Sequence, residues 1–132
     1  VIYLPELDEI YYADEDGAFL NGKPISVNSY NSHKGLYIVE GPNSILGEVK
    51  MKKLNPHCRH FHCAAVDFAW VACGRISATN FVKDTLWDYI PGQYIVEKAG
   101  GVIYNSTKMH IAANNEEFLQ MMKNNSSVIT TA

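Results

Sequence analysis

The pattern of apolar and polar positions in the first 28 residues predicts a β-meander. Val1–Leu4 and Glu9–Ala13 are β-rich runs separated by the turn sequence PELD. Asn-Gly at 21–22, between AFL and KPISV, favours a tight hairpin because both residues accept positive φ. The composition from 28 to 35 changes to Asn, Ser, His and Gly, which is typical of a loop. We therefore expect residues 1–34 to form an antiparallel unit of their own.

After residue 35, strand-like and helix-like segments alternate. The most apolar helix candidate, Cys63–Cys73, has Asp67 as its only charged residue, and such a helix is buried between layers. Alternation of this kind predicts an α/β domain over 35–124, with a mixed sheet covered on both faces by helices, followed by a tail at 125–132. The pattern predicts strands at 36–40, 58–62, 76–82, 102–104 and 109–114, and helices at 45–54, 63–73, from 84 or 85 to 99, and from 114 or 115 to 122.

Composition narrows the class of protein. A chain of 132 residues is long enough for one compact domain with a real core. The net charge of −3 and the scattered Lys and Arg argue against a nucleic-acid binder, and Lys50, Lys52 and Lys53 are interpreted as a solvated helix face. No apolar run approaches the roughly 20 residues that cross a bilayer.

The cysteines indicate the redox environment of the protein, and the first residues indicate how the chain begins. Three cysteines without a CxxC pair, and no signal peptide, predict a reducing, cytoplasmic setting. The chain opens in strand-like sequence without Met, and we interpret it as lacking its beginning. Residues 57–63 are rich in possible zinc ligands, but the spacing of these ligands fits no standard zinc-site pattern. They are His57, Cys58, His60, His62 and Cys63.

Asp88, in the stretch KDTLWDYIPGQYIVEKAGG, allows two interpretations. A first-turn aspartate interacts favourably with the helix dipole, by about 0.3–1 kcal/mol, and Pro91 in the same turn would lose no hydrogen bond. Alternatively, Asp88 is a hard-oxygen ligand of Mg²⁺, which binds few carboxylates together with phosphate oxygens and waters. The residues alone favour the first interpretation. Trp70 and Trp87 are expected in the core.

Four motifs, however, resemble those of the inositol monophosphatase family. WDYIPGQYIVEKAGGVI is similar to its WD-x-x-A-G…E-A-G-G signature, and DGAFLNGKPISVN to its G-A-F-x-N-G hairpin. AAVDFAWVACGRISA resembles its buried helix and following strand, and HIAANN its late strand. They occur in family order and spacing from Val1 to about Asn124. The resemblance implies a lithium-sensitive, Mg²⁺-dependent phosphatase with a five-layered αβαβα fold, of which this chain is the C-terminal half. Residues 1–34 would then belong to the large sheet of the N-terminal half.

The resemblance also implies roles for particular residues. Asp88 matches the aspartate that binds a catalytic metal and helps to place the attacking water. His62, Cys63 and Ala64 match the segment that holds substrate, partly through backbone N–H groups. The implied substrate is a small phosphorylated sugar, inositol or nucleotide, and a homodimer is the usual assembly. The other metal ligands of the family lie in segments that do not occur here, so we expect the 132-residue chain alone to be inactive.

Two departures from the family pattern concern the substrate. His62-Cys63 replaces Gly-Ser or Gly-Thr, and Phe81 stands where inositol-specific members have an acidic residue that binds a substrate hydroxyl. Because Phe cannot accept that hydrogen bond, inositol phosphate is not expected to be preferred. Two alternatives stay open: a member that has lost catalysis and serves as a binding or assembly subunit, and a phosphatase of a nucleotide 3′-phosphate or of fructose bisphosphate.

Overall fold

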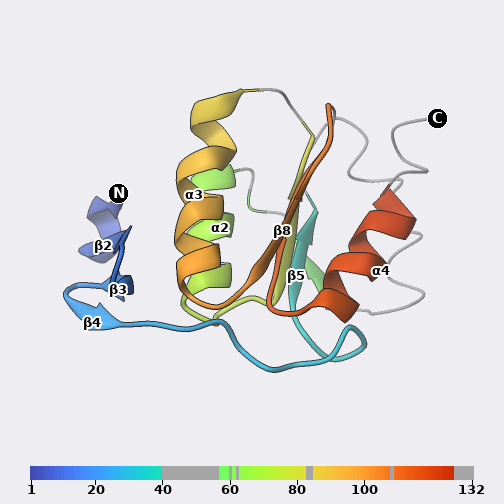
Figure 1. Ribbon diagram of the computed structural model, residues 1–132, viewed down its shortest axis with the longest axis horizontal. Helices are drawn as coiled ribbons and strands as arrows, with labels where there is room; N and C mark the ends of the chain where they lie inside the picture. The colour runs from blue at the N-terminus through green and yellow to red at the C-terminus, as the bar shows by residue number, and fades with distance from the viewer. Residues whose placement is uncertain (40–56, 60, 62, 83–84, 108, 127–132) are drawn as a thin grey trace.

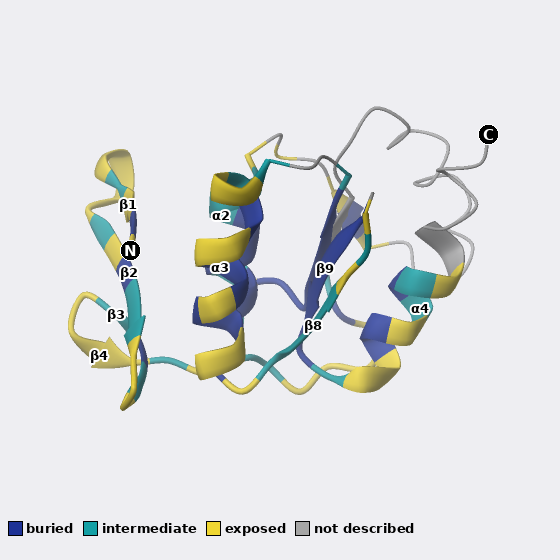
Figure 2. Cartoon of the chain, turned by 45° about the horizontal axis from the view of Figure 1, so that its top comes forward, coloured by how far each residue is buried: buried dark blue, intermediate teal, exposed yellow. Residues whose placement is uncertain are grey.

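The computed structural model describes residues 1–39, 57–59, 61, 63–82, 85–107 and 109–126. These residues form four alternating layers: a four-stranded sheet, the helices α2 and α3, a five-stranded sheet, and α4 (Figure 1). The main core lies where the middle helices face the first sheet, and the most buried strand segments are in the second sheet (Figure 2). The predicted mixed α/β architecture is confirmed, as part of a layered αβαβα fold.

The first sheet is the predicted meander. Its strands pair antiparallel in chain order, and the hairpin between the last two turns at Asn21 and Gly22, with φ of 51° and 81°. The Asn21 side chain also accepts a hydrogen bond from Ile10 N–H (2.8 Å) and donates one to the Asp8 carbonyl (3.0 Å), which joins the first turn of the sheet to the third. The elements are β1 (Ile2–Leu4), a 3₁₀ turn η1 (Pro5–Leu7), β2 (Glu9–Asp14), β3 (Gly17–Leu20) and β4 (Lys23–Pro24).

An ion pair joins this sheet to the loop after α2. The Arg75 guanidinium donates to both carboxylate oxygens of Glu9, at 2.6 and 2.8 Å, and to the Tyr11 hydroxyl at 3.0 Å. The hydrogen bond from Arg75 holds the pKa of the Glu9 carboxyl below its ordinary value of 4.5. Burial, and then the neighbouring Glu9, raise the pKa of the Tyr11 phenol above its usual range. The pair thus stabilises the contact between the first two layers.

The second sheet is mixed, as predicted, with strand order β6-β5-β7-β9-β8. β5 pairs parallel with β6 and β7, whereas β9 pairs antiparallel with β7 and β8. Of the strand expected at 58–62, Cys58–Arg59 form β6, whereas residues 60 and 62 lie outside the described residues, as does the predicted helix at 45–54. The strands are β5 (Tyr37–Val39), β6 (Cys58–Arg59), β7 (Ala78–Phe81), β8 (Val102–Asn105) and β9 (His110–Ala113).

The helices lie where the sequence predicts them. α2 (Ala64–Ala72) is apolar nearly all round because it contacts both sheets, and it packs closely against α3 (Leu86–Lys98) at Gly92 and Phe68. α4 (Glu116–Ser126) covers the opposite face of the second sheet and ends four residues beyond the expected Met122.

Two expectations about α3 are wrong. Trp87 is 77% exposed rather than buried, because α3 packs against α2 at Gly92, which lies about 140° around the helix from Trp87. Pro91 is the sixth residue of the helix and not part of its first turn. It lacks the N–H that would donate a hydrogen bond to the Trp87 carbonyl. Because Pro91 is exposed, water can donate to that carbonyl instead. Trp70, by contrast, packs against the core as expected.

Candidate functional site

The chain topology brings the starts of α2 and α3 to one edge of the second sheet. β6, α2 and β7 form a parallel crossover, so α2 begins at the carboxyl end of β6 and runs back across the sheet. β7 then returns to the same edge, where α3 begins. This edge is uppermost in Figure 1. Ligands of open α/β sheets bind outside the carboxyl ends of the parallel strands, and this edge is therefore the candidate site.

Neither helix start is capped by a side chain. The N-cap residues are Cys63 for α2 and Thr85 for α3, both in extended conformation, and the side chain of neither bonds to the first turn. First-turn N–H groups without such caps are donors that anions commonly use, and the helix dipole favours negative charge there. The edge therefore has the electrostatic character of a phosphate site.

Asp88 is the third residue of α3, and its N–H donates to the Thr85 carbonyl at 2.9 Å. It lies at the boundary between the two faces of the helix, since the preceding Trp87 is exposed and the following Tyr89 is 7% exposed. The half-buried Asp88 carboxylate is thus available to a ligand and is the oxygen type that Mg²⁺ prefers. It does not cap its own helix, because an N-cap residue stands outside the helix.

Phe81 is the last residue of β7 and therefore lies at the same edge of the sheet. It is 8% exposed and belongs to an aromatic cluster with Tyr89 and His110. His110 stacks on Tyr89 with ring centroids 3.5 Å apart, and each ring lies 6.5 Å from Phe81. An aromatic side chain, with no hydrogen-bond acceptor for a polyol, therefore stands at this edge.

The other predicted site residues are only partly described. Cys63 is exposed and Ala64 half-buried, both at the start of α2, while His62 lies outside the described residues. Within the described part of the chain, no group of three His, Cys, Asp or Glu side chains could hold a metal ion. Of the residues proposed for zinc, Cys58 is buried in β6 and Cys63 is exposed, and His60 and His62 lie outside that part.

The aromatic cluster was not predicted from the sequence. Its residues come from β7, α3 and β9, and only the strand pairing brings them together. The available signal was a histidine at the start of the otherwise apolar strand HIAA.

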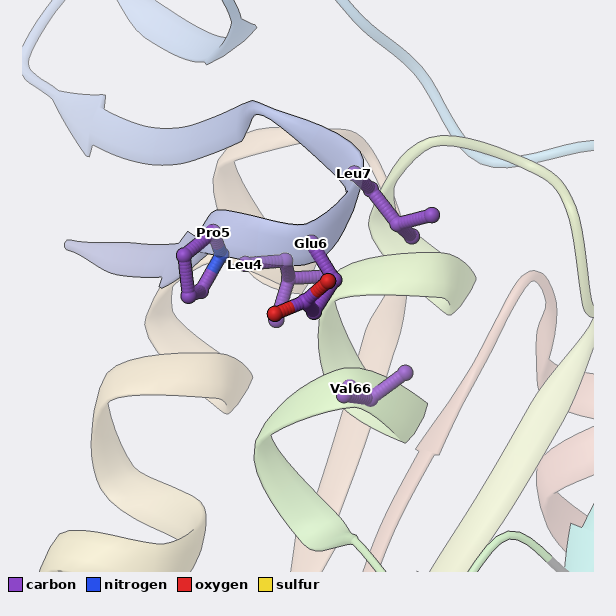
Figure 3. A pocket seen from close by; sticks show the side chains of 5 residues that line it. All are labelled: Leu4, Pro5, Glu6, Leu7 and Val66. Atoms are coloured by element: carbon purple, nitrogen blue, oxygen red, sulfur yellow. The ribbon is translucent and has the colours of Figure 1, made fainter.

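A separate hollow of about 240 Å³ lies between η1 and α2 (Figure 3). Its walls are apolar apart from Glu6, and none of the predicted site residues lines it. It lacks the converging polar groups of a specific ligand site. The lining residues are Leu4, Pro5, Glu6, Leu7 and Val66.

Comparison with known proteins identifies the family. The family model described as "Inositol monophosphatase family" matches residues 1–129. The chain belongs to this family. Inositol monophosphatase 1 of Solanum lycopersicum is 31% identical over 134 residues, which is 87% of this chain and 49% of that protein. A Thermotoga maritima protein named fructose-1,6-bisphosphatase/inositol-1-monophosphatase is 29% identical over 90% of this chain and 48% of its own length.

Solved structures of the family share the fold. The inositol monophosphatase of Anabaena (Nostoc) sp. PCC 7120 superposes with a TM-score of 0.83 at 26% identity, over 96% of this chain and 60% of that one. The Thermotoga maritima enzyme gives the same TM-score at 25% identity, over 96% and 56%. The chain spans about half the length of the curated relatives it matches. Among the described helices, none combines the length and apolarity needed to traverse a bilayer.

Proposed function

We propose that the protein containing this chain hydrolyses phosphate monoesters with Mg²⁺, and that Asp88 is one of the metal ligands. One observation carries the proposal. The half-buried Asp88 carboxylate lies in the first turn of α3, at the edge where α2 also begins, in a chain that matches the inositol monophosphatase family over residues 1–129.

The residues of this chain would act mainly by binding and orientation. Backbone N–H groups at the start of α2, from Cys63 and Ala64 onward, would donate to phosphate oxygens. Asp88 would hold Mg²⁺, which when bound neutralises phosphate charge and lowers the pKa of coordinated water. A carboxylate fits this cation, but one carboxylate does not make a catalytic site. The remaining ligands would come from the half of the family protein that this chain does not span.

The preferred substrate is proposed to be a small sugar phosphate rather than inositol monophosphate. Phe81 supports this choice because it cannot accept a hydrogen bond from a ring hydroxyl, and its packing in the aromatic cluster fixes it at the edge. The Thermotoga maritima relative, whose name combines fructose-1,6-bisphosphatase and inositol-1-monophosphatase, is consistent with a sugar bisphosphate. A nucleotide 3′-phosphate is the other ester that the test should include.

The test measures phosphate release by the complete gene product from inositol 1-phosphate, fructose 1,6-bisphosphate and a nucleoside 3′-phosphate, with Mg²⁺ or with EDTA. We expect Mg²⁺-dependent release that Asp88→Asn lowers by about a hundredfold or more, since loss even of a residue that supports a ligand commonly costs about 10–100-fold. Glu97→Gln, an exposed carboxyl on the same helix, is the matched control and should retain activity. Equal activity of Asp88→Asn and wild type would remove Asp88 from the metal site.

The isolated 132-residue chain should release no phosphate, because Asp88 is the one carboxylate that the described residues are proposed to supply to the metal. Release above that of a mock purification, by a sample of verified mass, would contradict this expectation.

A second candidate is a binding or assembly subunit without catalysis. It is favoured by the Salmonella typhimurium relative named Nus factor SuhB, 28% identical over 83% of this chain. His62 and Phe81, which depart from the family pattern, also support it. If the folded complete protein releases no phosphate from any of the three esters, this candidate is favoured.

A further inference from the structure

The aromatic cluster of Phe81, Tyr89 and His110 includes the residue that follows Asp88 in α3. His110 is 2% exposed, and its ring is nearly parallel to that of Tyr89, with planes 9° apart and centroids separated by 3.5 Å. Tyr89 immediately follows Asp88 in α3. The stack thus links the first turn of α3 to the sheet edge.

Three strands fix the position of His110. Strand pairing places it opposite Phe81 on one side and opposite Asn105 on the other. Its Nδ1 lies 2.8 Å from the Asn105 side-chain oxygen, and because that oxygen only accepts hydrogen bonds, Nδ1 carries the proton. The backbone and the ring of His110 are therefore both held, and Tyr89 stacks on a fixed surface.

The orientation of Asp88 follows from that of Tyr89. Successive side chains in an α-helix point about 100° apart, so the rotation of α3 that seats Tyr89 on His110 also determines where Asp88 points. The other neighbours offer little restraint, since Trp87 is 77% exposed and the Thr85 side chain does not cap the helix. Packing of Gly92 against Phe68 sets which face of α3 is buried, and among the described residues the Tyr89–His110 stack adds a restraint at the first turn itself.

We infer that His110 is a positioning residue: through Tyr89 it holds the start of α3 in the rotation that presents the Asp88 carboxylate to a divalent cation. The inference rests on the proposed function, because it requires Asp88 to be a metal ligand.

The adjacent residue in β9 provides a matched control. Side chains alternate between the two faces of a strand, and Ile111, 0% exposed, packs with Phe118 and Met122 of α4 on the opposite face. Ile111→Ala therefore damages the core from the same strand without removing a side chain that touches Tyr89. A purely structural role for His110 would make the two alanine variants behave alike.

The experiment measures Mn²⁺ binding to the complete protein by electron paramagnetic resonance, together with thermal unfolding. We expect His110→Ala to weaken Mn²⁺ binding about tenfold, in the range found when a residue supporting a metal ligand is removed. Ile111→Ala should lower the unfolding temperature and leave Mn²⁺ affinity unchanged. His110→Phe should restore most of the affinity, because a flat ring remains under Tyr89.

Asn105→Ala keeps the test decisive if His110→Ala does not fold. Asn105 is exposed, so its replacement should leave the core intact, and we expect a smaller weakening of Mn²⁺ binding in the same direction. Wild-type affinity in Asn105→Ala or in folded His110→Ala would overturn the inference and leave the proposed function standing. A wild-type protein that binds no Mn²⁺ and releases no phosphate would remove both.

Discussion

Gly92→Ala tests the contact between α2 and α3, and the sign of its effect separates two physical arguments. Helix propensity alone predicts that alanine in place of an interior helical glycine stabilises the protein by about 1 kcal/mol. The structure predicts the opposite. A Cβ at Gly92 would lie 2.8 Å from Phe68 Cγ, 3.0 Å from Cδ2, and closer still to the Phe68 Cβ, which is attached to the backbone and cannot swing aside.

To reach ordinary contact distances of 3.4–4 Å the two helices would have to separate by about 1 Å or more. Overpacking of this kind typically costs about 1–3 kcal/mol, and the contact with Phe68 Cβ puts this site near the upper limit. After subtraction of the propensity gain, we expect a net loss of about 1–2 kcal/mol, or roughly 5 °C in unfolding temperature for a chain of this size. The change in the free energy of unfolding is measured by urea unfolding of the wild type, Gly92→Ala and the exposed-site control Glu97→Ala. A Gly92→Ala protein as stable as the wild type, or more so, would refute the packing argument.

Two further predictions concern the first sheet. Glu9→Gln should lower the free energy of unfolding by about 0.5–1 kcal/mol at pH 7, since the Glu9–Arg75 pair is only partly buried. Because Arg75 lowers the pKa of Glu9, this contribution is fully present above the ordinary pKa of 4.5 and is lost as the pH falls through the lowered pKa of the folded protein. The two proteins should therefore converge in stability at acid pH, and a pH-independent difference would contradict the assignment. Asn21→Ala should cost about 1–2 kcal/mol, through two lost hydrogen bonds and a positive φ. Asn21→Gly, which accepts that φ, should be less harmful in the same denaturation assay, and equal losses would show that φ is unimportant here.

The elements that the sequence predicted best are those with one strong local cause. The Asn21-Gly22 hairpin depends on two residues that accept positive φ, and α2 is buried on nearly every side because two sheets enclose it. Asp88 was placed in the first turn of a helix by local sequence alone. Its proposed role at a metal, however, comes from family resemblance and not from local pattern.

The orientation of α3 could not be predicted, because its first turns carry large apolar side chains on several sides. Trp87, Tyr89 and Ile90 offer three possible buried faces, and the local pattern does not distinguish them. Close packing at Gly92 against Phe68 selects one face and leaves Trp87 in solvent. His110 was missed for a related reason: its importance arises from strand pairing between residues far apart in the chain.

The parallel arrangement of α2 and α3 has a consequence for the energetics of binding. Helices that begin at the same edge bring two positive poles together, each of about half an elementary charge. At a packing distance of about 9 Å and an effective dielectric constant of about 20, their mutual repulsion is about 0.5 kcal/mol. The contact at Gly92 holds the helices together against this repulsion. An anion at the shared edge would be attracted by both poles at once, so the arrangement that slightly weakens the fold favours negative charge at this edge.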